Sequence, residues 1–284
     1  MPWTVFTHDG TGATSAESRF RVQPTVPVGI TVAVVYTIIL TSIQQQSGIK
    51  YTEFFDSAYN AWRGPVLSLA IGSVLLVAFI AWARWDMLWR DPQRLPMTRL
   101  AWILLGTFIV AIVVRGVGIA YADVDTSLLM AILSLGVLVG FSEEMLFRGI
   151  FLRCMRNGQM SEGAAALWTT AAFGLFHLPN VFLGTGLSGL SQVVVAGLSG
   201  VALYYFRVAS GALVVAMVMH GLFDITTFLS PDYGAAWSQD VATPLQLAVW
   251  VLGAAVAVQL FRKARGYRLT PSGIVTAPQP EPPG

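Results

Sequence analysis

Residues 127–147 read SLLMAILSLGVLVGFSEEMLF, a stretch whose only charged side chains are Glu143 and Glu144. A helix of about 20 mostly apolar residues is long enough to cross the hydrocarbon core of a bilayer. Similar stretches recur along the chain, which is 55% hydrophobic and 11% charged, with a mean hydropathy of +0.65. The sequence therefore predicts an all-α fold, a polytopic membrane helical bundle.

We expect about eight transmembrane helices. They cover residues 28–43, 65–83, 100–121, 127–147, 164–178, 187–206, 209–229 and 243–261. If the N-terminus is cytoplasmic, fourteen of the 17 Lys and Arg residues fall on the cytoplasmic side. Because basic residues concentrate in cytoplasmic loops, this bias predicts that both termini are cytoplasmic. The expected location is a bacterial cell membrane.

The chain divides by composition into three parts. Residues 1–27 are polar and are predicted to be a disordered cytoplasmic segment, residues 28–262 form the bundle, and the Pro-rich residues 263–284 are predicted to be a disordered cytoplasmic tail. The net charge of +2 gives no sign of nucleic-acid binding. A single cysteine, Cys154, excludes an intrachain disulfide and a Cys-rich zinc site.

Five ionisable residues stand out deep within the expected spans: Glu143, Glu144, His177, His220 and Asp224. An ionisable residue near the bilayer centre costs about 2.5–3.5 kcal/mol on insertion scales, so each one requires an explanation. Counting residues from the cytoplasmic charges, at about 1.5 Å per residue, places the groups on three helices at similar depths. A single polar site within the membrane is the simplest explanation.

The two adjacent glutamates have different surroundings. Glu144 lies one turn before Arg148, in the order that favours a helical ion pair. Gly136 and Gly140 lie on the same face and would let a second helix approach closely. Glu143 points about 100° away and has no local cation. We therefore expect Glu144 to be paired and Glu143 to be suited to accept a proton from water. The alternative is that both glutamates serve only helix packing through Arg148.

The histidines each have a neighbour one helical turn away. Phe173 precedes His177 by four residues, so its ring can wall the imidazole. Asp224 follows His220 by four residues and can accept the imidazole N–H, or can contribute directly to the site. Taken alone, each histidine could instead be a satisfied structural residue. Arg115 lies near the outer end of its span, and we expect it to snorkel outward.

Together these residues resemble a known family. Glu143-Glu144-x-x-x-Arg148, Phe173-x-x-x-His177 and His220-x-x-x-Asp224 resemble the three motifs of the CPBP intramembrane proteases, the CAAX protease and bacteriocin-processing (Abi) family that includes the Rce1-like endopeptidases. The resemblance covers about residues 125–230. The third motif ends in Asp224, where the Rce1-type form has asparagine.

The resemblance implies an intramembrane endopeptidase that hydrolyses a membrane-associated protein or peptide, by CAAX-type or leader-peptide-type processing. The implied catalytic residues are Glu143, Glu144, Arg148, His177, His220 and Asp224, with Phe173 in contact with substrate. Two mechanisms remain open. Glu143 and His177 can activate a water while His220 stabilises the oxyanion, or His177, His220 and Glu143 can bind Zn²⁺. No other cofactor is implied.

Two further functions remain as alternatives. A proton-coupled transporter could use the same Glu–His cluster as a relay, but the sequence lacks the inverted repeats typical of that class. A non-catalytic membrane scaffold would leave the polar cluster without an explanation. The expected partners are therefore the lipid bilayer and a membrane-associated substrate, whose identity the sequence leaves open.

Overall fold

The computed structural model describes residues 20–91, 96–263, 267–270 and 273–276. The longer helices are α2 (Val26–Gln46), α4 (Leu67–Ala83), α5 (Arg99–Gly118), α6 (Thr126–Glu144), α8 (Glu162–Phe176), α9 (Gly189–Ser210), α10 (Leu213–Tyr233) and α11 (Ala236–Lys263). The shorter ones are η1 (Tyr51–Glu53), α3 (Ala58–Ala61), η2 (Trp62–Val66), η3 (Asp86–Leu88), η4 (Tyr121–Asp123), η5 (Met145–Phe151), α7 (Leu152–Asn157), η6 (Leu178–Val181) and η7 (Gly186–Ser188).

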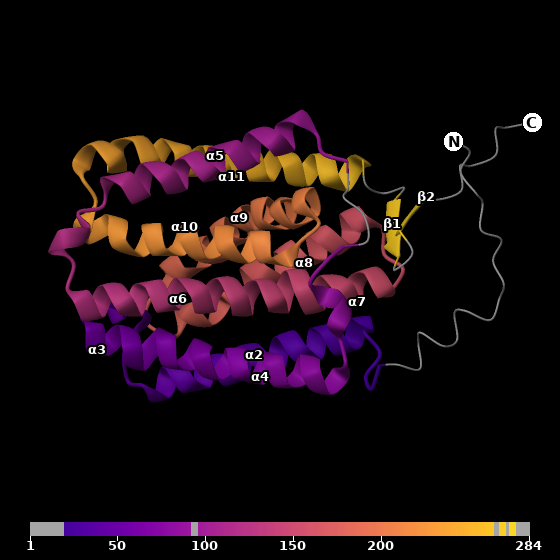
Figure 1. Ribbon diagram of the computed structural model, residues 1–284, viewed down its shortest axis with the longest axis horizontal. Coiled ribbons are helices and arrows are strands. Elements are labelled where there is room, and N and C mark those ends of the chain that lie inside the picture. Colours follow the sequence, from indigo (N-terminus) through magenta and orange to yellow (C-terminus); the bar gives the residue numbers. More distant parts are fainter. Residues whose placement is uncertain (1–19, 92–95, 264–266, 271–272, 277–284) are drawn as a thin grey trace, which may run out of the picture.

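The long helices run side by side as a bundle. In Figure 1, α2 and α4 form one flank, α5 and α11 form the opposite flank, and α6 and α10 lie between them. The pair α6–α10 makes the most extensive helix contact, followed by α5–α11. The helical membrane bundle predicted from the hydropathy is confirmed.

Seven of the described helical segments are long and apolar enough to cross a membrane: Val26–Gln46, Ala58–Ala83, Arg99–Gly118, Thr126–Asn157, Gly186–Ser210, Leu213–Tyr233 and Ala236–Arg262. The remaining predicted span, residues 164–178, corresponds to α8, which has only 15 residues. At about 1.5 Å per residue α8 is roughly 22 Å long, shorter than a hydrocarbon core of about 30 Å.

The chain nevertheless passes from one end of the bundle to the other between Glu162 and Leu183. Glu162, at the start of α8, shares Arg156 with Asp91, which follows the end of α4. The Leu183 carbonyl accepts a hydrogen bond from the Tyr51 backbone N–H, in the connection that precedes α4. These contacts lie at opposite ends of α4, so the short helix η6 and the residues that follow it to Leu183 complete the crossing that α8 begins.

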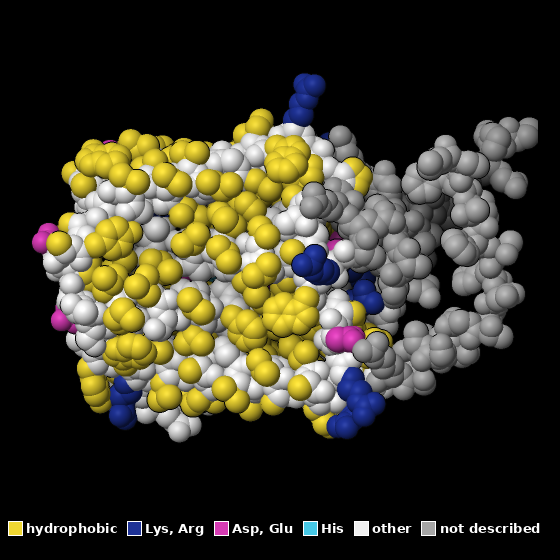
Figure 2. Space-filling model, in the orientation of Figure 1, with side chains coloured by type: hydrophobic (Ala, Val, Ile, Leu, Met, Phe, Trp, Pro, Cys, Tyr) yellow, Lys and Arg dark blue, Asp and Glu magenta, His cyan; other side chains and the backbone are white. Residues whose placement is uncertain are grey.

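The surface of the bundle matches a membrane environment. Figure 2 shows hydrophobic side chains spread over the middle of the visible face, with Lys, Arg, Asp and Glu side chains near its two ends. Large exposed apolar residues include Val74, Val117, Val137 and Val251. An apolar surface this continuous is stable against lipid and would be an aggregation hazard in water.

Short polar side chains determine where several spans begin. The side chains of Thr98, Asp125 and Ser161 accept hydrogen bonds from backbone N–H groups in the first turns of α5, α6 and α8. Such caps satisfy N–H groups that a helix leaves unpaired. Gly211 ends α9 with a positive φ of 71°, a conformation that glycine adopts without a steric cost. These signals fix the register of the helices that carry the polar residues.

The tail that was predicted to be disordered includes two short strands among its described residues. Residues Tyr267–Thr270 (β1) and Gly273–Thr276 (β2) form an antiparallel pair. Both segments contain β-branched or aromatic residues, which favour strands over disorder. The predicted disordered residues 1–19, and residues 264–266, 271–272 and 277–284 of the predicted tail, lie outside the described part of the chain.

An ion cluster joins four segments, the connection after α4 and the helices α7, α8 and α9, at the end of the bundle where α4 and α9 end. Asp91 contacts Arg207 Nη2 at 2.7 Å and Arg156 Nη1 at 2.9 Å, and Arg156 also pairs with Glu162 at 2.6 Å. The Tyr204 hydroxyl donates to the same Glu162 carboxylate at 2.6 Å. All these side chains are buried, so the cluster holds the helix ends together through partners that replace water.

Removing the Asp91 charge should destabilise the protein in a pH-dependent way. Burial would raise the pKa of Asp91, but Arg156 and Arg207 outweigh burial and hold this pKa below its usual 3.8. The carboxylate therefore contributes stability that is present above 3.8 and is lost as pH falls through the lower folded pKa. We expect Asp91→Asn to cost about 3–5 kcal/mol at pH 7.

This expectation can be checked by unfolding in detergent micelles across a pH series. The difference in the free energy of unfolding between wild type and Asp91→Asn should stay constant down to about pH 4 and become smaller below it. Asp232→Asn, which alters an exposed carboxylate in the last turn of α10, is the matched control and should change little. A gap that is small at pH 7, or that widens on acidification, would contradict this assignment.

Candidate active site

The two glutamates are the last residues of α6, where the helix continues into the π-helical turn η5. Glu144 Oε1 accepts from Arg148 Nη1 at 2.8 Å, and both side chains have no exposed surface. The predicted Glu144–Arg148 pair is thus confirmed. π-helical turns often occur at functional sites, and this one contains Arg148.

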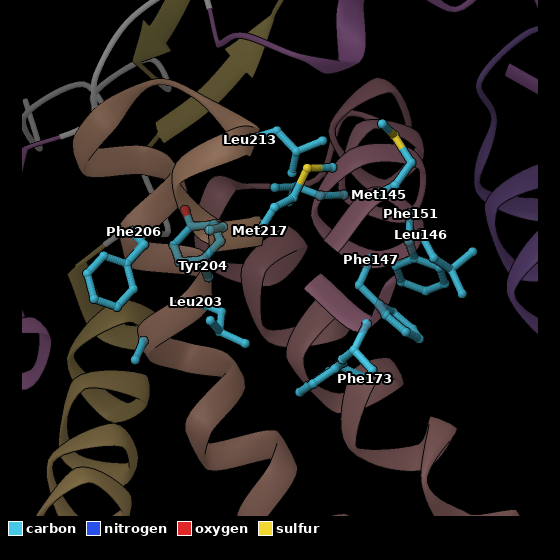
Figure 3. Packing of buried hydrophobic residues seen from close by; sticks show 14 of the residues in the cluster. Met145, Leu146, Phe147, Phe151, Phe173, Leu203, Tyr204, Phe206, Leu213 and Met217 are labelled. Atoms are coloured by element: carbon cyan, nitrogen blue, oxygen red, sulfur yellow. The ribbon is translucent and has the colours of Figure 1, made fainter. Parts of the chain in front are cut away.

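Arg148 is enclosed by groups from two other helices, α8 and α9. Its Nη2 donates to the Gly200 carbonyl of α9 at 2.8 Å, and its Cζ lies 4.3 Å from the centroid of the Phe173 ring of α8. Arg207 Nη1 in turn donates to the Arg148 backbone carbonyl. A Cβ added at Gly200 would approach Arg148 Nη2 to 2.7 Å, so only glycine leaves room for the guanidinium. Figure 3 shows Phe173 beside Phe147 in the surrounding apolar packing.

The glycines of α6 bring α10 against the glutamates. A Cβ at Gly140 would lie 2.2 Å from the Met217 carbonyl oxygen, and one at Gly136 would lie 2.4 Å from Ile225. A Cβ added at Gly221 of α10 would in turn lie 2.5 Å from the Gly136 carbonyl oxygen. The predicted close approach along Gly136 and Gly140 is confirmed, and it places His220 next to Glu144.

His220 is held mainly by Glu144, which corrects the prediction that Asp224 is its partner. His220 Nδ1 lies 2.9 Å from Glu144 Oε1, whereas Nε2 lies 3.7 Å from Asp224 Oδ2, beyond hydrogen-bond range. A carboxylate can only accept, so Nδ1 carries the proton and Nε2 faces Asp224. Glu144 therefore orients His220 while it also pairs with Arg148.

His177 is fixed at the C-terminal end of α8. Its Nδ1 lies 3.0 Å from the Phe173 carbonyl oxygen, an acceptor, so Nδ1 is the protonated nitrogen and Nε2 is left as an acceptor in the neutral ring. The Phe173 ring stands edge-on to His177, with centroids 5.2 Å apart, and to His220, with centroids 5.6 Å apart. The predicted wall of the His177 imidazole is confirmed, and it separates the two histidines.

The predicted polar residues meet at two adjoining cavities. Glu143, His177 and Asp224 line the first, and His177, His220 and Asp224 line the second. Glu144 and Arg148 line neither cavity. The Glu143 side chain is 6% exposed, and its Oε2 has no hydrogen-bond partner among the described residues. Glu143 is therefore the glutamate that a water in the cavity can reach.

Sequence reasoning missed a tyrosine in the loop after α2. Tyr51 lines both cavities, and its hydroxyl accepts from Gln192 Nε2 at 2.8 Å. Gln192 Oε1 accepts in turn from Asn180 Nδ2 at 3.0 Å. Burial is the main reason why the pKa of Tyr51 rises to about 12, so the hydroxyl keeps its proton. Residues this far apart in sequence carry no local signal of the contact.

Arg115 does not snorkel outward, which corrects a second prediction. Its side chain is buried within the bundle, where Nη2 donates to Gln246 Oε1 at 2.6 Å and Nη1 to Thr227 Oγ1 at 3.4 Å. The guanidinium also lies 5.2 Å from the Phe223 ring centroid. Polar partners on α10 and α11 supply the inward contacts that the span alone does not reveal.

The predicted zinc ligands are not arranged as a metal site. Among the side chains that the structure describes, no three His, Cys, Asp or Glu residues are grouped so that they could hold a metal ion. Nδ1 of each histidine already faces an oxygen acceptor, which leaves one nitrogen per ring. The free Nε2 atoms alone do not decide the matter, because metal-bound histidines also have their second nitrogen paired with an oxygen. Because the described residues form no suitable group of three, the donor set Glu143, His177 and His220 does not fit Zn²⁺ in this conformation.

Comparison with known proteins gives one match. Residues 125–226 match the family model described as type II CAAX prenyl endopeptidase Rce1-like. The matched segment begins at the Asp125 cap of α6 and includes Glu143, His177, His220 and Asp224. No curated protein and no solved structure gives a significant match.

Proposed function

We propose that this chain, whose residues 125–226 form an Rce1-like domain of the CPBP family, is an intramembrane endopeptidase that cleaves a membrane-associated CAAX-type protein. The observation that carries the proposal is that Glu143, His177 and Asp224 line one cavity inside the bundle. Family membership supports CAAX-type proteolysis in general, and the cavity supplies a place where a peptide bond and a water can meet.

Glu143 is proposed as the general base. It takes a proton from a water as the water oxygen attacks the scissile carbonyl carbon, and it returns that proton to the leaving amine. His177 holds the water, because its Nε2 is an acceptor directed away from the Phe173 carbonyl. The C–N bond then breaks, and the two products carry a new carboxylate and a new amine.

His220 is proposed to stabilise the oxyanion. The Glu144 carboxylate holds Nδ1, which aims Nε2 toward Asp224 and the second cavity. When the ring carries both protons, Nε2–H can donate to the developing negative charge. Arg148 acts through Glu144, since it fixes that carboxylate without lining either cavity. Asp224 is the acceptor that lies beyond Nε2.

A cleavage assay with metal control tests this proposal. The purified full chain in detergent should release the C-terminal tripeptide from a farnesylated peptide that ends in Cys-Val-Ile-Met. Cleavage should survive exhaustive chelation, and metal analysis of the active protein should find well below about one equivalent of zinc. Restoration of a chelator-sensitive activity by stoichiometric zinc would overturn the glutamate mechanism and leave the endopeptidase proposal in place.

A further inference from the structure

Arg115 is a buried cation that the proposed catalytic steps do not use. Its exposed fraction is 7%, and its hydrogen-bond partners, Gln246 and Thr227, are both neutral. Within the described residues, no Asp or Glu oxygen lies within 4.0 Å of its side-chain nitrogens. A buried charge without a counter-ion is costly, so a group that balances it is a physical expectation.

The atoms around Arg115 form a set of donors. The guanidinium has five N–H groups, two of which are accounted for by Gln246 and Thr227. Gln246 Nε2 is buried and has no hydrogen-bond partner among the described residues. A planar guanidinium beside a free amide N–H₂ matches a carboxylate, which accepts two parallel hydrogen bonds.

The donor set opens onto the proposed active site. Arg115 and Gln246 line the same cavity as His177, His220 and Asp224. Thr227 follows His220 by seven residues on α10, which corresponds to about 10 Å along the helix axis. Three residues of extended peptide cover about the same distance, at roughly 3.3–3.6 Å per residue. A tripeptide that leaves the site beside His220 can therefore reach Arg115.

We propose that Arg115, with Gln246 and Thr227, binds the free C-terminal carboxylate of the substrate. This inference rests on the proposed function and deepens it, because it makes the enzyme specific for a cleavage point a fixed distance from a free chain end. Such a site would set the length of the released peptide, because it holds the terminal carboxylate at a fixed distance from the scissile bond. The chain would thereby cleave C-terminal motifs in preference to internal sequences of the same composition.

The substrate itself provides the sharpest test. The full wild-type chain is assayed with two peptides that end in farnesyl-Cys-Val-Ile-Met, one a free acid and one a C-terminal carboxamide. We expect kcat/KM for the acid to exceed that for the amide by roughly 10- to 100-fold, the range for a charge-assisted hydrogen-bonded pair. Arg115→Gln should remove most of this preference, and Arg115→Lys should keep part of it. Equal cleavage of both peptides by wild type would overturn the proposal.

A matched variant controls for charge. Arg63 is exposed in η2, so Arg63→Gln removes one positive charge without touching the cavity and should leave the acid preference unchanged. Loss of the preference in Arg63→Gln as well would show that overall charge is responsible, and it would count against an Arg115 site. The wild-type comparison needs no variant, so a misfolded Arg115→Gln chain does not remove the test.

A binding measurement separates this proposal from the proposed function. The tripeptide Val-Ile-Met, as free acid and as amide, is titrated into the wild-type chain by calorimetry. Tighter binding of the acid that requires Arg115, without any peptide cleavage, would keep the carboxylate site and overturn the endopeptidase. Cleavage together with equal binding of acid and amide would keep the endopeptidase and overturn the carboxylate site. Glycerol 3-phosphate is titrated in the same way. If it binds in an Arg115-dependent manner and the tripeptide acid does not bind, Arg115 is assigned to a lipid headgroup and the carboxylate site is overturned.

Discussion

Replacement of Glu143 by glutamine should abolish peptide cleavage and leave the protein folded. The substitution keeps the shape of the side chain and removes its ability to take a proton from water. A positioned general base contributes typically about 10²–10⁴-fold to a rate, so kcat should fall by at least about 100-fold. Glu143 Oε2 has no hydrogen-bond partner among the described residues, so little structure depends on the carboxylate.

The measurement is the initial rate of tripeptide release from the farnesylated peptide, together with the melting temperature of the same sample. Glu53→Gln is the matched control, because Glu53 lies in the exposed connection after α2 and pairs only with exposed Lys50 among the described contacts. Its rate should stay close to that of wild type. A Glu143→Gln chain that cleaves within about threefold of wild type would remove Glu143 from the role of base.

Local spacing was sufficient to predict part of this site. The four-residue separation in Glu144–Arg148 and in Phe173–His177 fixes contacts within one helical turn, and both contacts exist. The hydropathy also located the spans from local sequence, because a bilayer requires a certain length and apolarity of each helix separately. The glycines at 136 and 140 similarly specify a close neighbour without identifying it.

The contacts that the sequence predicted wrongly, or did not predict, are those that depend on which helices become neighbours. His220 lies 76 positions from Glu144 in the chain, so a partner four residues away, Asp224, was the natural but incorrect expectation. Arg115 was expected to snorkel because its span offers no anion, whereas its partners come from α10 and α11. Pairwise helix packing, and with it the cavity, has no local signature in one sequence.

Replacement of Glu144 by glutamine should destabilise the fold more than any change at Glu143. One oxygen of Glu144 serves both Arg148 Nη1, at 2.8 Å, and His220 Nδ1, at 2.9 Å. An amide keeps a hydrogen bond but removes the negative charge, and Arg148 has no exposed surface through which water could replace it. Removal of one partner of a buried ion pair costs about 3–5 kcal/mol, so that loss is expected in the free energy of unfolding.

A double substitution can distinguish charge imbalance from simple loss of packing. If the uncompensated Arg148 charge causes the defect, Glu144→Gln combined with Arg148→Met should be more stable than Glu144→Gln alone, because an apolar side chain of similar length removes the buried cation. The double variant should still be inactive, since His220 would lose the carboxylate that orients it. Additive losses in the double variant would instead mean that Glu144 and Arg148 contribute independently. Unfolding measured for all four chains in one detergent decides between these outcomes, and it tests the inference that α6 and α10 are held in register through one shared carboxylate.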